Sequence, residues 1–232
     1  MRIQKYLSEQ GILSRRETES YIRQGRITLN GKIIREMGVQ IDPKKDKVEV
    51  LDAKPTSAKS RRPIEKKMTI ALYKPRGITS SKNSAEGKTV FEDFPKLKNL
   101  NTVGRLDKES EGLLLLSNDG VITAVITSDE HLVEKEYEVT VREEVRQWHI
   151  KKMEEGIMLD GKKTLPAKGE LLGGHTFSLI LKEGRHHQIR RMADALHLTI
   201  TRLIRVRIHD ITLQGLTPGK ARTLTEKEVA GL

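Results

Sequence analysis

The sequence predicts an α+β protein with a small domain over residues 1–52, a linker over 53–67 and a larger mixed domain over 68–232. Three observations predict this arrangement. Apolar residues at helical spacing give way to a hairpin signal within the first fifty residues. The stretch 53–67 is rich in lysine, arginine and proline and poor in large apolar residues. From residue 68 onward, short apolar runs typical of strands outnumber segments with helical spacing.

Two short helices are expected at the start of the small domain. Apolar residues at positions 3, 6 and 7 fall at helical spacing, and Gly11 is expected to end that helix. Ser14 and Glu17 match a capping box, in which the serine hydroxyl accepts from a backbone amide and the glutamate reaches back to the serine amide. A second helix is therefore expected to begin after Ser14 and to end at Gly25.

A β hairpin completes the small domain. Asn30-Gly31 is a strong hairpin signal because both turn positions require a positive φ. Strands are expected on either side, over 27–29 and 33–34, and the valines at positions 48 and 50 supply a last strand.

Several cations of this domain are predicted to share one face. Arg15 and Arg16 fall in the first turn of the second helix, where the helix dipole makes a cation unfavourable by roughly a few tenths of a kcal/mol. This placement indicates an external anion such as phosphate; the alternative is an ordinary solvated helix surface. The candidate phosphate contacts are Arg15, Arg16, Arg23, Arg26 and Lys32.

The formal net charge of +11 is distributed unevenly. Residues 1–52 carry +3, residues 53–67 carry +5 and residues 68–232 carry +3. A polyanion partner is the first interpretation of the total. Because a charge run is usually solvated, 53–67 is either a solvated linker or a linker that also contacts nucleic acid.

The larger domain begins with a predicted strand over 68–73 and a turn over 74–77. The four leucines of 113–116, bounded by turn signals, predict a buried strand. Asp107 lies in the loop that enters this strand, and the neighbouring Arg105 and Lys108 are expected to keep its carboxylate ionised.

Two further elements are expected to bring partners to that loop, and another strand and another helix are expected in the same domain. Residues 134–141 alternate as a strand, with Tyr137 either a core tyrosine or a site residue. Residues 177–181 form a strand, after which a helix is expected to begin with Arg185, His186 and His187 and to carry Arg190 and Arg191 on its polar side, a natural cradle for phosphate. The strand 204–209 is expected to have one apolar face and one cationic face formed by Arg205, Arg207 and His209. A helix over 143–155 is expected to turn Val145 and Trp148 inward.

Composition excludes several classes of protein. No apolar run approaches the roughly 18 residues that a membrane span needs, so no membrane partner is expected. The chain has no cysteine, which excludes disulfides and thiolate metal sites and makes the cytoplasm the expected compartment. No cluster has metal-ligand spacing, so no metal is expected.

The ordered motifs carry a resemblance to known families. Residues 2–50, with two helices, a capping box and a hairpin, resemble the RNA-binding domain named after the fourth protein of the small ribosomal subunit. The motifs YKPRG (73–77), VGRLDKESEGLLLLSNDG (103–120), KEYEV (135–139) and EGRHHQIRRM (183–192) resemble those of the ribosomal RNA pseudouridine synthases that carry this domain. The resemblance spans nearly the whole chain and implies a catalytic domain with a long, mostly antiparallel mixed sheet.

The resemblance also implies roles for particular residues. Asp107 matches the catalytic aspartate, Tyr137 the tyrosine that stacks on the target base, and Arg190 the basic residue paired with the aspartate. Arg105 matches a residue that holds the extruded nucleotide, and Lys74 belongs to the turn that supports the floor of the cleft. The remaining candidate RNA contacts are Arg185, Arg191, Arg15, Arg16, Arg23 and Lys32. Ser110 stands where the family usually has threonine.

The function that the resemblance implies is isomerisation of uridine to pseudouridine in ribosomal RNA. Of the two subunits, the resemblance favours the RNA of the large one. It implies no cofactor, a structured RNA stem-loop as partner and a monomeric enzyme. Two other classes remain open at this point. A ribosomal RNA-binding or assembly factor would explain the charge without chemistry, and a glycoside hydrolase would normally need two carboxylates.

Overall fold

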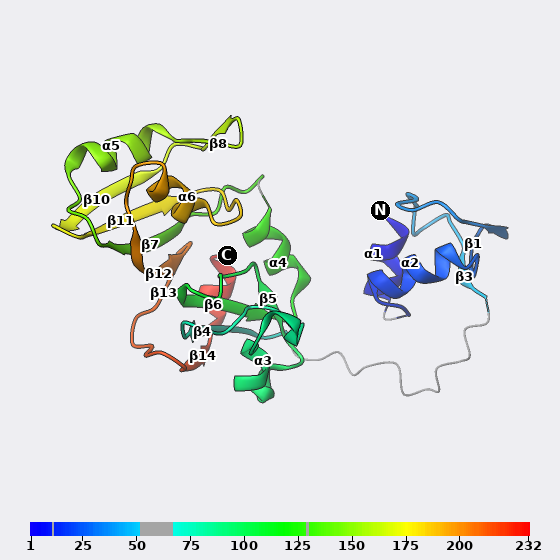
Figure 1. Cartoon of the computed structure of the whole chain (residues 1–232). Coiled ribbons are helices and arrows are strands. Elements are labelled where there is room, and N and C mark those ends of the chain that lie inside the picture. The colour runs from blue at the N-terminus through cyan, green and yellow to red at the C-terminus, as the bar shows by residue number, and fades with distance from the viewer. Residues whose placement is uncertain (11, 52–66, 129) are drawn as a thin grey trace. The chain divides into compact units, whose positions relative to one another are not determined.

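The computed structural model describes residues 1–10, 12–51, 67–128 and 130–232. Its contacts divide the chain into two compact units, 1–66 and 67–232, and each is described by itself (Figure 1). The α+β fold class is confirmed. The predicted linker lies outside the described residues except for Lys67, whose ammonium pairs with Asp119 at 3.0 Å.

The N-terminal unit has two helices and a three-stranded antiparallel sheet. Its elements are α1 (Ile3–Glu9), α2 (Arg15–Arg23), β1 (Ile27–Leu29), β2 (Lys32–Ile33) and β3 (Val48–Val50), with the strand order β2-β1-β3. The predicted capping box is confirmed, because Ser14 Oγ accepts from Glu17 N and Glu17 Oε2 accepts from Ser14 N. Gly11 lies outside the described residues.

Positive φ at Asn30 and Gly31 confirms the predicted hairpin turn. One small core joins the helices to the sheet, formed by Ile3, Leu7, Ile22, Ile27 and Ile41. The stability of this unit therefore depends on few large buried apolar side chains, as is usual for so small a domain.

The C-terminal unit is built on a nine-stranded sheet. The main strand order is β10-β11-β7-β12-β6-β4-β14, with β13 paired to β12 and β5 paired to β6. The strands are β4 (Thr69–Lys74), β5 (Asn101–Val103), β6 (Glu111–Ser117), β7 (Lys135–Val141), β10 (Lys168–Gly173), β11 (Thr176–Leu181), β12 (Ile200–Ile208), β13 (Ile211–Thr212) and β14 (Ala221–Thr223). A separate hairpin joins β8 (Met158–Leu159) to β9 (Lys162–Lys163).

Five α-helices and two 3-10 turns accompany the sheet. The helices are α3 (Val90–Asp93), α4 (Gly120–Thr127), α5 (Gln147–Glu155), α6 (Gln188–Asp194) and α7 (Glu226–Ala230), and the turns are η1 (Ser84–Glu86) and η2 (Pro95–Leu97). Among the described residues, no helix is long and apolar enough to span a bilayer.

The sheet changes direction once, between β6 and β12. These two strands pair in parallel through only Ile204 with Glu111 and Arg205 with Gly112, whereas every other pairing of this sheet is antiparallel. We call this junction the seam. An ion pair between Arg202 and Glu111, at 2.6 Å, also crosses it.

Among its described residues, the C-terminal unit has three cores, of which the Ile126 core contains Ile208 of β12 as well as leucines of β6, on both sides of the seam. The Phe177 core joins β7, β11 and β12 to α5 and α6. On the other side, the leucines of β6 alternate, so that Leu113 and Leu115 enter the Ile126 core under α4 while Leu114 and Leu116 enter the Phe91 core under α3. The predicted buried strand is thus covered on both faces.

Three predicted details of the fold are wrong. The helix expected from residue 143 begins at Gln147, and Trp148 is 52% exposed while His149, Ile150 and Met153 are buried. The later helix begins at Gln188, so that residues 185–187 precede it. The cationic face expected on β12 does not form, because Arg205 is buried.

Candidate active site

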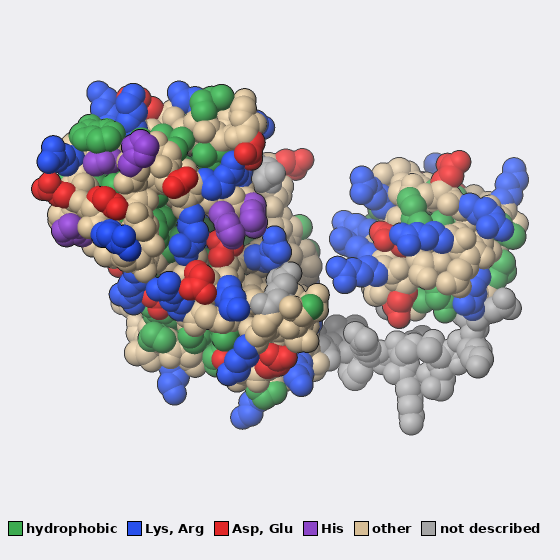
Figure 2. Space-filling view, viewed as in Figure 1, with side chains coloured by type: hydrophobic (Ala, Val, Ile, Leu, Met, Phe, Trp, Pro, Cys, Tyr) green, Lys and Arg blue, Asp and Glu red, His purple; other side chains and the backbone are tan. Residues whose placement is uncertain are grey.

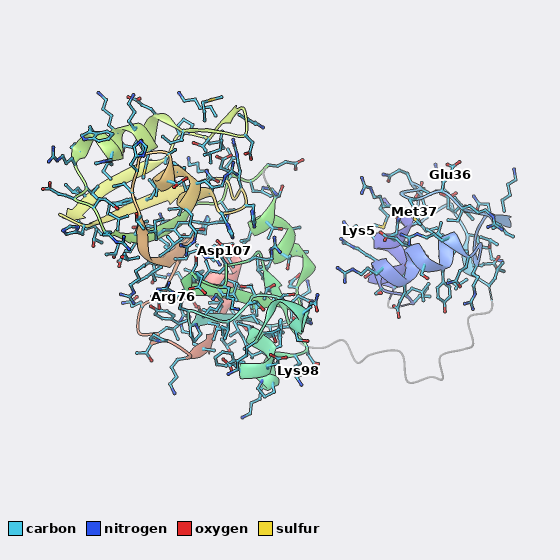
Figure 3. All side chains as sticks on the ribbon, viewed as in Figure 1. Lys5, Glu36, Met37, Arg76, Lys98 and Asp107 are labelled. Carbon is cyan, nitrogen blue, oxygen red and sulfur yellow. The ribbon has the colours of Figure 1, made fainter. Side chains whose placement is uncertain are left out.

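Asp107 lies on the loop between β5 and β6, and backbone contacts from several elements fix that loop. Ser80 Oγ donates to Leu106 O at 2.7 Å and accepts from Leu106 N at 3.1 Å. Gly77 N donates to Lys108 O at 2.8 Å. The segment after β4 thus holds the loop on both sides of Asp107. This is the kind of support that the resemblance implies for residues 74–77. Figure 3 places Asp107 near the middle of the C-terminal unit, with Arg76 close by.

Glu109 anchors the same loop to β12 through Arg76. The Arg76 guanidinium donates to Glu109 Oε2 at 2.9 Å and to Thr201 O at 3.2 Å. The hydrogen bond from Arg76 holds the pKa of Glu109 below its ordinary value. Glu109 is therefore engaged with a cation, and nothing in this geometry makes it a second catalytic carboxylate beside Asp107.

Arg205 is a buried residue that supports the loop of Asp107. The sequence did not indicate this role. Only 3% of this residue is exposed. Its Nε donates to Leu113 O at 2.7 Å and its Nη1 donates to Arg105 O at 3.3 Å, two residues before Asp107. A bulge in the pairing of β12 with β7 lies between residues 205 and 207, which breaks the alternation and explains why the side chain points inward.

A cleft of about 320 Å³ opens around Asp107. It brings together five of the predicted site residues, namely Asp107, Tyr137, Arg190, Arg105 and Arg185. Six of its lining residues are Lys or Arg, against two that are Asp or Glu. A cleft with this balance attracts an anion to a single free carboxylate.

Tyr137 combines the two roles that its sequence pattern left open. Its side chain is half-buried and packs against the Phe177 core, and it also lines the cleft. An aromatic ring held in this way can offer one surface to a base. Tyr137 comes from β7 and Asp107 from the loop before β6, so the cleft spans the seam.

The predicted ion pair between Arg190 and Asp107 is absent from the described residues. Arg190 Nη2 donates instead to Glu109 O at 3.0 Å and to Ser110 Oγ at 3.2 Å. Ser110 thus uses the hydroxyl that it shares with threonine. The nearest titratable partner of Asp107 is His187, whose Nε2 lies 3.6 Å from Asp107 Oδ1.

The other two arginines around α6 hold protein groups rather than a phosphate cradle. Arg185 pairs with Glu183 and donates to the carbonyls of Lys162 and Lys163. Arg191 pairs with Asp160 at 2.5 Å and does not line the cleft. Both therefore connect α6 to the β8–β9 hairpin. The phosphate contacts expected of these two arginines stay a prediction.

Lys74 is fully buried, so the predicted RNA contact by this residue is wrong. Its Nζ donates to Pro75 O and Ile78 O, both at 2.8 Å, and so shapes the turn below the loop. Burial lowers the pKa of Lys74 to about 8, against the opposing attraction of Asp107 and nearby glutamates. Its hydrogen bonds hold the turn from which Gly77 N donates to Lys108 O.

The candidate RNA contacts of the N-terminal unit lie on its surface. Arg15, Arg16, Arg23 and Lys32 are all exposed, and none of the four forms an ion pair with a described residue. Figure 2 shows basic side chains gathered on one side of this unit. Surface cations without protein partners are available to phosphates.

Among the described residues, no group of three or more His, Asp or Glu side chains is arranged to hold a metal ion. The arrangement offers the Asp107 carboxylate, the Tyr137 ring and several cations in one basic cleft, whose other carboxylate, Glu183, pairs with Arg185. Such a cleft suits an enzyme that brings a carboxylate to the sugar of a polyanion.

Comparison with known proteins agrees with this class of enzyme. The family model for RNA pseudouridylate synthases matches residues 68–195, and the model for the S4 domain matches residues 1–46. The chain therefore belongs to the RNA pseudouridine synthase family and carries an S4 domain at its N-terminal end.

Individual relatives match over the full chain. Ribosomal large subunit pseudouridine synthase B of Bacillus subtilis is 35% identical, with 100% of this chain and 95% of the relative covered. Ribosomal small subunit pseudouridine synthase A of Haemophilus influenzae is also 35% identical, with 100% and 99% covered. A crystal structure of a pseudouridylate synthase superimposes with a TM-score of 0.72 at 32% identity, covering 100% of this chain and 99% of the other.

Proposed function

We propose that this enzyme isomerises uridine to pseudouridine in ribosomal RNA, with Asp107 as the catalytic carboxylate. The observation that carries the proposal is the position of Asp107 as a partly exposed carboxylate in a basic cleft beside Tyr137. Relatives named for ribosomal subunits support ribosomal RNA as the substrate. Between the subunits we propose the large one, for which the B. subtilis relative is named.

The reaction needs little more than this cleft offers. The bond between uracil N1 and the sugar C1′ breaks, the uracil turns over, and a new bond joins its C5 to C1′. The proton on C5 leaves and N1 ends protonated, so nothing is oxidised and no group is acquired from outside. One carboxylate therefore suffices, acting on the sugar as nucleophile or as base.

The remaining residues of the cleft serve the extruded nucleotide in this proposal. Taking a uridine out of its stack costs a few kcal/mol, which stacking and phosphate contacts offset. Tyr137 stacks on the base, and the exposed Arg105 contacts the backbone. Arg190 acts on the loop of Asp107 rather than on its carboxylate, through Glu109 O and Ser110 Oγ.

Docking on the RNA is assigned to the N-terminal unit. We propose that residues 1–52 bind a structured stem-loop through Arg15, Arg16, Arg23 and Lys32, and that residues 68–232 form the catalytic domain of a monomeric enzyme. The exposed, unpaired state of those four cations supports this division. With this division of roles, the shape of the RNA and the docking of the first domain determine which uridine is modified.

The test is the variant Asp107→Asn, with Asp194→Asn as its control. Asp194 is exposed on α6 and outside the cleft, so the control makes the same chemical change away from the site. Asp107→Asn should bind ribosomal RNA about as well as the parent and form no pseudouridine. Turnover above a tenth of the parent's would exclude Asp107 as the catalytic group. An inactive parent would instead favour the rival function of an assembly factor.

Mapping decides the substrate. Carbodiimide treatment followed by primer extension, on ribosomal RNA made with and without this enzyme, locates each pseudouridine that depends on it. A stop in large-subunit RNA is expected. A stop found only in small-subunit RNA would overturn the choice of subunit while leaving the reaction intact.

A further inference from the structure

His187 is the one ion-pair partner of Asp107 among the described residues. Its Nε2 faces Asp107 Oδ1 at 3.6 Å, whereas Oδ2 has no partner among those residues. The two side chains are 44% and 35% exposed, so the pair is open to the cleft that both line. The carboxylate is therefore engaged on one oxygen and open on the other.

The backbone of His187 is held in an unusual conformation. Its φ of 52° and ψ of 31° lie in the left-handed region, which few non-glycine residues adopt, although histidine does so more often than most. His187 stands at the N-cap of α6, yet its side chain forms no capping hydrogen bond. The imidazole is directed to Asp107 instead, and strain of this kind is concentrated at functional sites.

Neighbouring contacts hold the imidazole in place. The ring of His186 stacks on it with centroids 3.9 Å apart. Gln188 accepts from Arg185 N at 3.0 Å and donates to Glu183 at 2.8 Å, which braces the segment on both sides of the histidine pair. The ring is thus positioned before any substrate binds.

We infer that His187 is a positioning residue that holds Oδ1 of Asp107 and presents Oδ2 to the sugar of the bound nucleotide. This inference rests on the proposed function of Asp107. The imidazole Nε2 lies 3.6 Å from Asp107 Oδ1, close enough to orient the carboxylate. Asp107 belongs to the β6 side of the seam and His187 to the α6 side, so their contact joins the two sides of the cleft, as the contacts of Arg190 also do.

The experiment compares His187→Asn with His197→Asn in single-turnover assays on ribosomal RNA. Asparagine tolerates the left-handed region, so the first variant removes the imidazole with little added strain. His197 is an exposed histidine with a φ of 59° just beyond the other end of α6, and it does not line the cleft. The control therefore makes the same change in the same backbone conformation.

His187→Asn should lower the rate at saturating enzyme about 10- to 100-fold, as expected for the loss of one charge-assisted contact. The half-saturating enzyme concentration should change by less than about threefold, because the residue acts on Asp107 and not on RNA affinity. A melting temperature close to that of the parent would verify folding. If His187→Asn is unstable, His187→Gln takes its place in the same comparison.

Two results would overturn the inference. One is a saturating rate for His187→Asn equal to that of His197→Asn. The other is a change confined to the half-saturating concentration, which would make His187 an RNA-binding residue. Asp107→Asn is measured in parallel: if it is active, the proposed function fails, and if it is inactive while His187→Asn matches its control, only the inference about His187 fails.

Discussion

Gly112 allows the two strands of the seam to approach each other, and its replacement by alanine tests that approach. A Cβ at this position would lie 2.4 Å from Arg205 O and 2.7 Å from Arg205 N, both backbone atoms. The φ of Gly112 is +108°, a value that L side chains rarely adopt. The substitution therefore adds a steric clash to a backbone strain at the point where Arg205 supports the loop of Asp107.

The two costs can be estimated separately. Holding alanine at such a φ costs about 1–3 kcal/mol. Forcing a methyl group against the backbone of β12 costs a further 1–3 kcal/mol or so, the typical range for overpacking. The expected loss is thus roughly 2–6 kcal/mol, against a typical total stability of about 5–15 kcal/mol. Activity should fall as well, since Arg205 Nη1 donates to Arg105 O in the same loop.

Urea denaturation of the whole chain measures this loss. Trp148 is the one tryptophan of the chain and lies in the C-terminal unit, so its fluorescence reports on that unit. The control is Gly219→Ala, because Gly219 has a φ of +78° but open space where a Cβ would lie. Gly219→Ala carries the strain alone. Equal urea midpoints for the two variants would show that the close approach of β12 to Gly112 adds no cost, and would refute the steric argument.

Two further predictions concern the buried lysine and the docking surface. The pKa of Lys74 is about 8 when folded and near 10.5 when unfolded. The unfolded chain therefore binds the extra proton between these pH values, and stability should rise across that window by up to roughly 3 kcal/mol. Lys74→Met should lack this rise in urea midpoints measured at pH 7.5 to 10.5, and an identical pH dependence would contradict the assignment. Arg15→Glu combined with Arg16→Glu should weaken binding to ribosomal RNA and flatten its salt dependence, with the slope measured by titration at several salt concentrations. Unchanged binding would remove the N-terminal unit as the docking surface.

Local patterns in the sequence predict most of the elements but not the support of the site. The capping box, the Asn30-Gly31 turn and the leucine strand depend on neighbouring residues, and all three form as expected. The burial of Arg205 depends on a bulge against β7, a strand more than sixty residues earlier. Alternation along β12 alone therefore predicted a solvent-facing arginine.

Contacts around α6 are a second feature that the sequence could not predict. The motif 183–192 brings Arg190 to the cleft, as the resemblance implies, but its partner is the loop backbone and not Asp107. The left-handed conformation of His187 shortens the helix and aims a different residue at the carboxylate. No periodicity signals such a conformation outside glycine and asparagine, so this contact could not be found from the sequence.

The seam also determines how substitutions combine. The Phe177 core and the Phe91 core share no residue, whereas the Ile126 core contains Leu113 and Leu115 of β6 together with Ile208 of β12. Changes in stability at well-separated sites without common partners add. Substitutions in the Phe177 core should therefore combine additively with substitutions in the Phe91 core, whereas substitutions in the Ile126 core affect both sides of the seam. Gly112, Arg205, Asp107 and His187 also make contacts across the seam, so a change in any of them affects both sides at once.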